Sequence, residues 1–288
     1  MKCLSFHASY LCRSAGACCR AGWTISFDPG EHTRARTLKV PAESFVRLQD
    51  GSTAAARLAD GTCSFLDTGT RLCAIHREGG HGSLPLACRM FPRSVLHDAR
   101  GTLVSLSHFC PTAAGLLFEP GPPPAIVDAP ASLTDVGPLD GLDARDAWPP
   151  LLRPGVLMDL ESYDVWERLG IELLTRDRIA PDSAVTALDT VTARIAAWPP
   201  GAPLGDVIRE AFGAAAPPMA ALDPLQMPVK RWLAARLFAC WVAYQGDGLG
   251  AIVDYLRACL AIFNAELARD GKALEAIRRS DLQIMHKP

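Results

Sequence analysis

Cysteine thiols are crowded into one end of this 288-residue chain. Eight of the ten cysteines fall within the first 110 residues, and two of them, Cys18 and Cys19, are adjacent. The others in this group are Cys3, Cys12, Cys63, Cys73, Cys88 and Cys110. Thiolates bind zinc, copper(I) and iron–sulfur clusters, so a local concentration of them points to a metal site. Disulfide bridges and redox chemistry are the alternatives.

The first residues of the chain argue against disulfides. A secretory signal has an apolar stretch after its basic start, whereas cysteines and an arginine occupy that place here. No run of about 18 or more apolar residues occurs, so we expect no membrane segment. We therefore expect a cytoplasmic protein whose thiols stay reduced. A disulfide between the adjacent Cys18 and Cys19 would also strain the peptide that joins them.

The spacing of the cysteines excludes the commonest metal-binding frames. Zinc fingers carry paired C-x2–4-C motifs and bacterial ferredoxins a C-x2-C-x2-C run, and neither occurs. The C-x3-C-x2-C motif of radical S-adenosylmethionine enzymes is also absent. We predict metal ligation by seven cysteines: Cys12, Cys18, Cys19, Cys63, Cys73, Cys88 and Cys110.

Seven thiolates exceed what one tetrahedral zinc ion needs. A cluster, two metal ions, or one ion with some thiols behind it all remain open. Cys3 could be a metal ligand or a thiol that does not bind metal. Cys240 and Cys259 are predicted to be core thiols because they are isolated on apolar helical segments.

Other polar residues near the cysteines are weaker candidates. Arg89 and Arg93 follow Cys88 and could bind an anionic cofactor through their guanidinium groups, or form ordinary salt bridges. His76 and His108 lie close to cysteines in sequence, but we expect surface or hydrogen-bonded histidines rather than ligands. No catalytic residue can be named from the sequence.

Composition limits the partners. The chain is 49% apolar with a net charge of −2, divided into +5 for residues 1–118 and −7 for residues 119–288. There is no dense basic stripe with interleaved aromatic residues, so we expect no nucleic-acid partner.

Gly246-Asp-Gly248-Leu-Gly250 resembles a nucleotide-binding motif, but no strand precedes it, and we interpret it as a turn between helices.

The elements that position the cysteines form an irregular first half. Glu119–Pro124 contains four prolines and breaks the chain. We predict a Cys-rich metal-binding domain over 1–119, a Pro/Gly-rich linker over 120–155 and a helical domain over 156–288. The predicted fold class is mainly α: an irregular metal-centred N-terminal half with short strands, followed by a helical bundle.

Periodicity places the individual elements. Apolar residues at helical spacing predict helices over about 160–173, 183–195, 228–244 and 250–269, with a short basic helix at the end. We also predict a helix over 42–58. Alternation predicts strands at Trp23–Phe27 and Thr102–Leu106.

Four blocks in this first half resemble a known family. Cys12–Asp28 has the order C, CC, G-W-x-I-x-x-D; Cys63–Ile75 reads C-x-F-L, then L-C-x-I; Leu84–Arg93 contains C-R-x-F-P-R; and Ser105–Pro111 ends in C-P. Together they resemble the start of bacterial FliB, the flagellin lysine N-methylase. All but the last also resemble the wider YkgJ-like family of zinc- or iron-chelating cysteine clusters.

The two resemblances imply different functions. The YkgJ-like one implies zinc or iron chelation. The FliB one implies methyl transfer from S-adenosylmethionine to lysines of a protein substrate, assisted by a metal centre such as a [4Fe–4S] cluster. Cys3 lies outside the blocks, and the C-terminal half resembles the methylase only in being helical. A non-enzymatic module that stores, senses or structurally uses the metal, with a helical half that docks a partner, is the alternative. The sequence does not indicate an oligomeric state.

Overall fold

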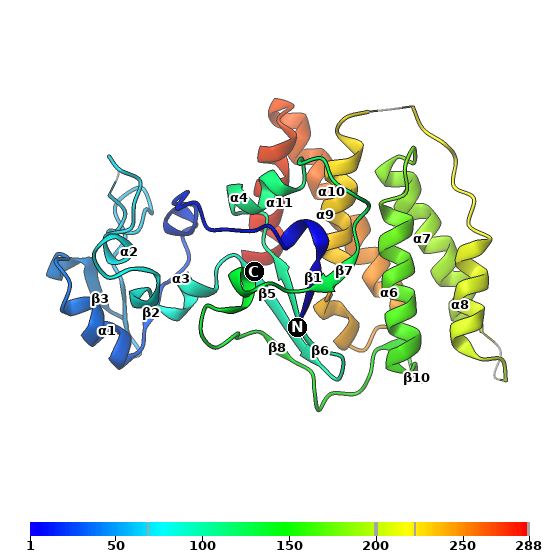
Figure 1. The fold of residues 1–288 in the computed structure, drawn as a ribbon, viewed down its shortest axis with the longest axis horizontal. Helices are drawn as coiled ribbons and strands as arrows, with labels where there is room; N and C mark the ends of the chain where they lie inside the picture. The colour runs from blue at the N-terminus through cyan, green and yellow to red at the C-terminus, as the bar shows by residue number, and fades with distance from the viewer. Residues whose placement is uncertain (68, 199–200, 222, 287–288) are drawn as a thin grey trace.

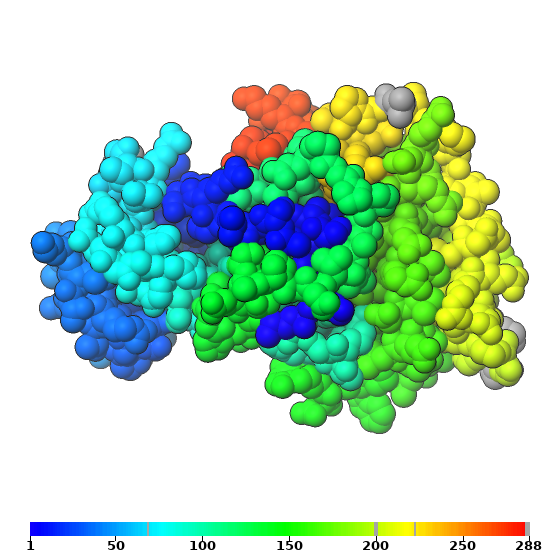
Figure 2. Space-filling view, viewed as in Figure 1, coloured from blue at the N-terminus to red at the C-terminus, as the bar shows by residue number. Residues whose placement is uncertain are grey.

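The computed structural model describes residues 1–286 apart from 68, 199–200 and 222. It has three parts: a lobe of short elements at one end, a small sheet in the middle, and long helices at the other end (Figure 1). We call the first part, residues 11–91, the cysteine lobe. In the space-filling view its blue and cyan surface projects beyond the rest of the molecule (Figure 2).

The cysteine lobe contains three short strands and several single-turn helices. Its elements are η2 (Cys18–Arg20), β2 (Ser26–Phe27), α1 (Pro29–Arg36), η3 (Ala42–Ser44), β3 (Phe45–Arg47), β4 (Thr53–Ala55), α2 (Ala74–Gly79), η4 (His81–Ser83) and α3 (Leu86–Met90). The strands form an antiparallel sheet of order β2-β4-β3. Helix α1 begins with a capping box between Asp28 and Glu31, the strongest local start signal in this lobe.

The helix predicted over 42–58 is wrong, because this segment is a hairpin of β3 and β4. Gly51 has a φ of +83° and lies in the turn that joins the strands. The Phe45 ring packs at 5.3 Å from the Phe27 ring and 5.1 Å from the Phe65 ring. Packing against these rings favours an extended segment, and such tertiary contacts override local helical preference.

A five-stranded sheet lies between the lobe and the long helices. Its strands, in spatial order, are β7 (Ile126–Asp128), β1 (Lys2–Leu4), β6 (Gly101–Leu106), β5 (Arg93–Asp98) and β8 (Leu142–Asp143). β5 and β6 form an antiparallel hairpin, and β1 runs parallel to β6. The strand predicted at Thr102–Leu106 is confirmed by β6, whereas only the end of Trp23–Phe27 is extended, as β2. The segment predicted as a linker supplies both edge strands, β7 and β8.

The helical second half is confirmed. The long helices are α6 (Leu160–Leu174), α7 (Pro181–Ala196), α8 (Leu204–Gly213), α9 (Gln226–Leu237), α10 (Leu249–Asp270) and α11 (Ala273–His286). The smaller elements outside the lobe are η1 (Ser5–His7), α4 (Pro111–Leu116), α5 (Ala131–Thr134), β9 (Leu151–Arg153), β10 (Val156–Leu157) and η5 (Trp241–Tyr244). Helix α9 ends before the predicted residue 244 because Ala239 takes a φ of +54°, which turns the chain into η5. No helix in the described part of the chain is long and apolar enough to cross a membrane.

The molecule has separate cores. The largest joins the sheet to the long helices and fully buries Trp166 and Trp232 together with Leu96 of β5. As predicted, Cys240 and Cys259 are buried in this main core. A smaller core lies inside the cysteine lobe and contains Cys19 and Cys63 among apolar side chains. Cys3, in β1, is fully buried in a third cluster. The domain boundary at 119 stays a prediction.

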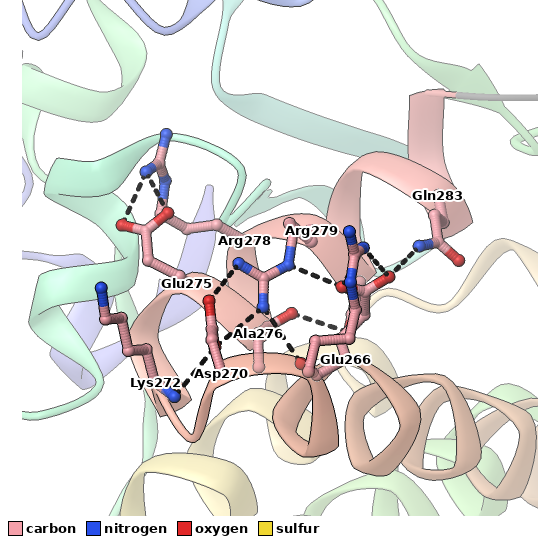
Figure 3. A network of polar contacts seen from close by, with 10 residues as sticks. Glu266, Asp270, Lys272, Glu275, Ala276, Arg278, Arg279 and Gln283 are labelled. Carbon is pink, nitrogen blue, oxygen red and sulfur yellow. Dashed lines mark hydrogen bonds and ion pairs between the residues drawn. The ribbon is translucent and has the colours of Figure 1, made fainter.

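Helix α11 is held against α10 by a group of ion pairs (Figure 3). Arg279 donates to Glu266 at 2.6 Å and to Asp270 at 3.2 Å, and Gln283 donates to Glu266 at 2.6 Å. Glu266 therefore receives two side chains from successive turns of α11. This contact sets the position of Asp281, which lies between them in sequence.

Asp281 is a fully buried carboxylate that ties three segments together. Its Oδ2 accepts the backbone N–H of His108, and its Oδ1 accepts the Trp232 indole N–H at 2.7 Å. Burial alone would raise the pKa of Asp281, but Arg236 and His108 hold it well below its usual range. His108 Nε2 in turn lies 3.1 Å from His7 Nε2, so the network reaches the N-terminal segment.

The turn before α10 gives a test of the fold. Gly248 has a φ of +81°, and a Cβ atom there would lie 2.7 Å from the Arg153 backbone. We expect Gly248→Ala to lower the free energy of the transition that unfolds the main core by about 1–3 kcal/mol, measured by urea denaturation. Gly250→Ala, two residues on, meets nothing within 4 Å and is expected to be neutral or slightly stabilising. Equal stabilities of the two variants would contradict this turn geometry.

Candidate metal centre

The vicinal cysteines lie on a single tight turn. Cys18 and Cys19 open η2, and their Sγ atoms are 4.0 Å apart. Two thiolates on one tetrahedral zinc ion, with bonds of about 2.3 Å, are separated by about 3.8 Å. The spacing of this pair therefore fits joint ligation of one ion.

Two further cysteines reach the pair from later segments. The Cys63 backbone N–H donates to the Cys19 carbonyl at 2.8 Å, which brings residue 63 beside η2. Cys73 is the residue before α2, at its N-cap. The Cys19 thiol interacts with those of Cys18, Cys63 and Cys73. We call these four side chains the thiol quartet.

The four thiols of the quartet have different pKa values. Its contacts with Cys18, Cys63 and Cys73 raise the pKa of Cys19, and hydrogen bonding to Cys19 lowers the pKa of each of those three. For Cys73 the value falls to about 7, helped by the backbone N–H groups of Ile75 and His76. Three of the four sulfurs are thus shifted towards the thiolate form, which is the form that binds metal.

The other three predicted ligands lie around the same pocket. A cavity of about 70 Å³, which we call the thiol pocket, is lined by six of the seven cysteines: Cys12, Cys18, Cys19, Cys73, Cys88 and Cys110. Cys12 is exposed, whereas burial raises the pKa of Cys88. Cys110 is buried at the N-cap of α4, with its Sγ 3.9 Å from the Tyr10 hydroxyl. The sequence-predicted ligands are therefore gathered, with Cys63 joining through the quartet.

The cysteine thiols lie near one another, but they do not form a complete coordination sphere. Among residues 1–286, leaving out 68, 199–200, 222 and the His286 side chain, no group of three or more His, Cys, Asp or Glu side chains is arranged so that it could hold a metal ion as it stands. The thiols must move closer together to ligate a common ion. The donor set itself, Cys19 with three thiols around it on three chain segments, fits zinc or iron.

The arginines selected from the sequence make other contacts. Arg89 forms an ion pair with Glu31 at 3.3 Å. Arg93 donates to the carbonyls of Leu133 at 2.6 Å and Ser132 at 2.8 Å. Arg93 also lines the thiol pocket, so its part in cofactor binding stays a prediction.

A third arginine, Arg57, was missed by the sequence analysis. Its guanidinium donates to the Cys19 carbonyl at 3.3 Å, and its charge lowers the pKa of Cys63. Residue 57 pairs with Cys63 in an isolated β-bridge, a contact with no signal in the cysteine spacing. Arg57 is therefore a cation that favours thiolate at Cys63, as Arg77 does at Cys73.

The two histidines near cysteines in sequence lie in different surroundings. His108 is buried and hydrogen-bonded to His7, in the Asp281 network, and does not line the thiol pocket. His76 does line it, beside His81, at a ring-centroid distance of 5.9 Å. His76 is thus the histidine of the predicted pair that is placed near the thiols.

Comparison with known families decides the class of this segment. Residues 11–111 match the family model CxxCxxCC, described as "Putative zinc- or iron-chelating domain". This segment is similar to that cysteine-cluster family. The match covers the cysteine lobe, β5, β6 and Cys110, and agrees with the YkgJ-like resemblance. Comparisons with curated proteins and with solved structures gave no match to the chain.

The cysteine-cluster domain departs from its family's name at one position. The spacing C-x-x-C-x-x-C-C fits Cys12, Cys18 and Cys19, but Ala15 stands where the second cysteine would be. This chain therefore builds its centre with one thiol fewer in the first block. The spacing of Cys12 from the vicinal pair was a signal of this motif that the sequence analysis did not use.

The thiol pKa values predict selective alkylation of the metal-free protein. Hydrogen bonding to Cys19 lowers the pKa of Cys73 to about 7, whereas burial raises the pKa values of Cys240 and Cys259 to about 12. We expect iodoacetamide to modify Cys73 at least about a hundredfold faster than either core thiol, as followed by peptide mass spectrometry. The Cys73 rate should rise as pH increases through 7 and then level off. A rate that keeps rising to pH 9 would contradict the lowered pKa.

Proposed function

We propose that the protein is a zinc- or iron-binding protein in which the thiol quartet holds a single ion. The observation that carries the proposal is the position of Cys19, whose thiol interacts with three other cysteine thiols from η2, residue 63 and the start of α2. The 4.0 Å spacing of the Cys18 and Cys19 sulfurs supports a shared ion.

The residues around the quartet favour the ligated state. The Cys19 carbonyl accepts from the Cys63 N–H and from Arg57, which fixes two ligand-bearing segments against each other. Glu31 accepts from the Leu86 N–H at 2.7 Å and so anchors α3, the helix of Cys88, to α1. A bound ion would cross-link these segments, and its binding energy would become folding energy.

Three thiols remain outside a four-coordinate site. Cys12, Cys88 and Cys110 line the adjoining pocket and act in this proposal as neighbours of the ion, not as its ligands. An iron–sulfur cluster that used some of them is the competing arrangement, and it differs in containing inorganic sulfide.

Methyl transfer to a protein substrate stays a prediction from resemblance. The thiol pocket, at about 70 Å³, is well below the roughly 300–1,000 Å³ of cavities that hold cofactor-sized ligands. A methyl donor would therefore need a site outside this pocket. Docking of a partner by the helical half is likewise a prediction without a specific contact to support it.

Metal content tests the quartet directly. We expect protein purified without oxygen to hold about one zinc or iron per chain and no acid-labile sulfide. Cys19→Ser should lose most of the metal, because Cys19 contacts the other three thiols. Cys12→Ser should keep it, and Cys259→Ser, in the main core, is the control for a cysteine substitution that leaves the lobe unchanged. Metal is measured by mass spectrometry and sulfide by colorimetry.

Two results would overturn the single-ion site. Sulfide in stoichiometric amounts with iron would favour a cluster. Equal loss of metal from Cys12→Ser and Cys19→Ser would show that the quartet is not a separate unit. Addition of metal should also raise the midpoint of thermal unfolding of the lobe, since saturation at 1,000 times Kd stabilises by about 4 kcal/mol.

A further inference from the structure

A second, larger cavity lies on the helical side of the sheet. It has a volume of about 370 Å³ and is bounded by β5, the end of α9, η5 and the last turns of α11. This is within the roughly 300–1,000 Å³ typical of small-molecule sites. Phe91 and Arg93 line both this cavity and the thiol pocket, so the two spaces share a wall.

A buried cation, Arg236, faces this cavity with unused donors. Its side chain is 4% exposed. Nη2 donates to the Leu106 carbonyl at 2.9 Å, Nη1 contacts the Met285 sulfur, and Nε has no hydrogen-bond partner. The Tyr255 hydroxyl also interacts with this guanidinium. Sulfur is a weak acceptor, and a buried donor without an acceptor is costly. Arg236 Nε therefore lacks any acceptor, and the contact of Nη1 is with a weakly accepting sulfur.

The charge of Arg236 is only partly balanced. Asp281 Oδ1 lies 3.9 Å from Arg236 Nε, beyond hydrogen-bond distance, and its own oxygens already accept from His108 and Trp232. Asp281 does not line the cavity. The acidic side chain that does, Asp140, is exposed. An anion in the cavity would thus meet an attractive charge at depth and a repulsive one near solvent.

The rest of the lining is mainly apolar. Phe238 and Ile284 contribute buried and half-buried surface, and Trp241 is 43% exposed. Ser105 and Tyr255 add hydroxyl groups. Arg93 also lines the cavity, but its guanidinium already donates to the carbonyls of Leu133 and Ser132. An apolar wall with one cation that has donors to spare is suited to a flat organic molecule with one negative charge, because a phosphate dianion would need more donors than one guanidinium.

We propose that this cavity binds a small organic carboxylate, with the carboxylate oxygens on Arg236 and the apolar part of the molecule against Trp241 and Phe238. The binding does not require metal in the thiol quartet. It supplies the acceptor that Nε lacks and removes apolar surface from water.

Benzoate and its uncharged analogue benzamide are the probes. Titration of the full chain by calorimetry should give benzoate binding about tenfold or more tighter than benzamide, the difference expected for a charge-assisted hydrogen bond. Inorganic phosphate should bind more weakly than benzoate. Tryptophan fluorescence should change on binding, and Trp241→Phe should remove that change.

Arg236→Met should abolish the preference for benzoate over benzamide. Arg231→Met is the matched control: Arg231 lies on the same helix, is 5% exposed, and donates to the carbonyls of Leu117 and Gly121, outside this cavity. Ser94→Trp fills the cavity from β5 and leaves Arg236 in place, so it should block binding even if Arg236→Met folds poorly.

Absence of benzoate binding at 10 mM, a concentration about a thousandfold above a Kd of about 10 μM, would overturn the proposal. So would equal affinities for benzoate and benzamide, or unchanged binding in Ser94→Trp. Loss of the preference in Arg231→Met as well as Arg236→Met would show that a general effect of the substitution, not the cavity cation, is responsible.

Discussion

The buried carboxylate of Asp281 is the constraint on which the arrangement of the two halves depends. Its burial removes it from water, and hydrogen bonds from His108 and Trp232 and the charge of Arg236 offset the cost of that desolvation. Removal of one partner from such a group costs about 3–5 kcal/mol. His108 lies two residues before Cys110, so the last block of the cysteine-cluster domain is fastened to α9 and α11 of the helical half. The same carboxylate leaves Arg236 short of acceptors, and this shapes the cavity beside it.

The helical half could be predicted because its helices are long and each has a continuous apolar face. Leu160, Tyr163 and Trp166 recur at helical spacing, and α6 occupies those residues. The segment 42–58 has no such support. Its strands are three residues each, and they are extended because Phe45 packs against Phe27 and Phe65, which come from elsewhere in the chain. Elements this short take their structure from tertiary contacts.

The sequence predicted which thiols lie near one another, but not how they group. A concentration of cysteine thiols predicts metal binding, and the order of the four sequence blocks indicated the family. Which four thiols meet depends on two local features, the Cys63 N–H bond to the Cys19 carbonyl and the placement of Cys73 before α2. Arg57 reaches the quartet through a β-bridge, and Arg236 reaches its cavity through the fold of α9. Neither carries a signal in the sequence, because both roles depend on contacts that folding creates.

The separation of the cores has a consequence for cooperativity. The apolar cluster around Cys19 and Cys63 is distinct from the one that buries Trp166 and Trp232. A small core of this kind has a lower opening free energy than the main one, so it can unfold as a unit of its own. Unfolding of this chain is then a sequence of two transitions, and a single free energy does not describe it. Metal occupancy acts on the first transition, while the sheet, the Asp281 network and the Arg236 cavity persist through it.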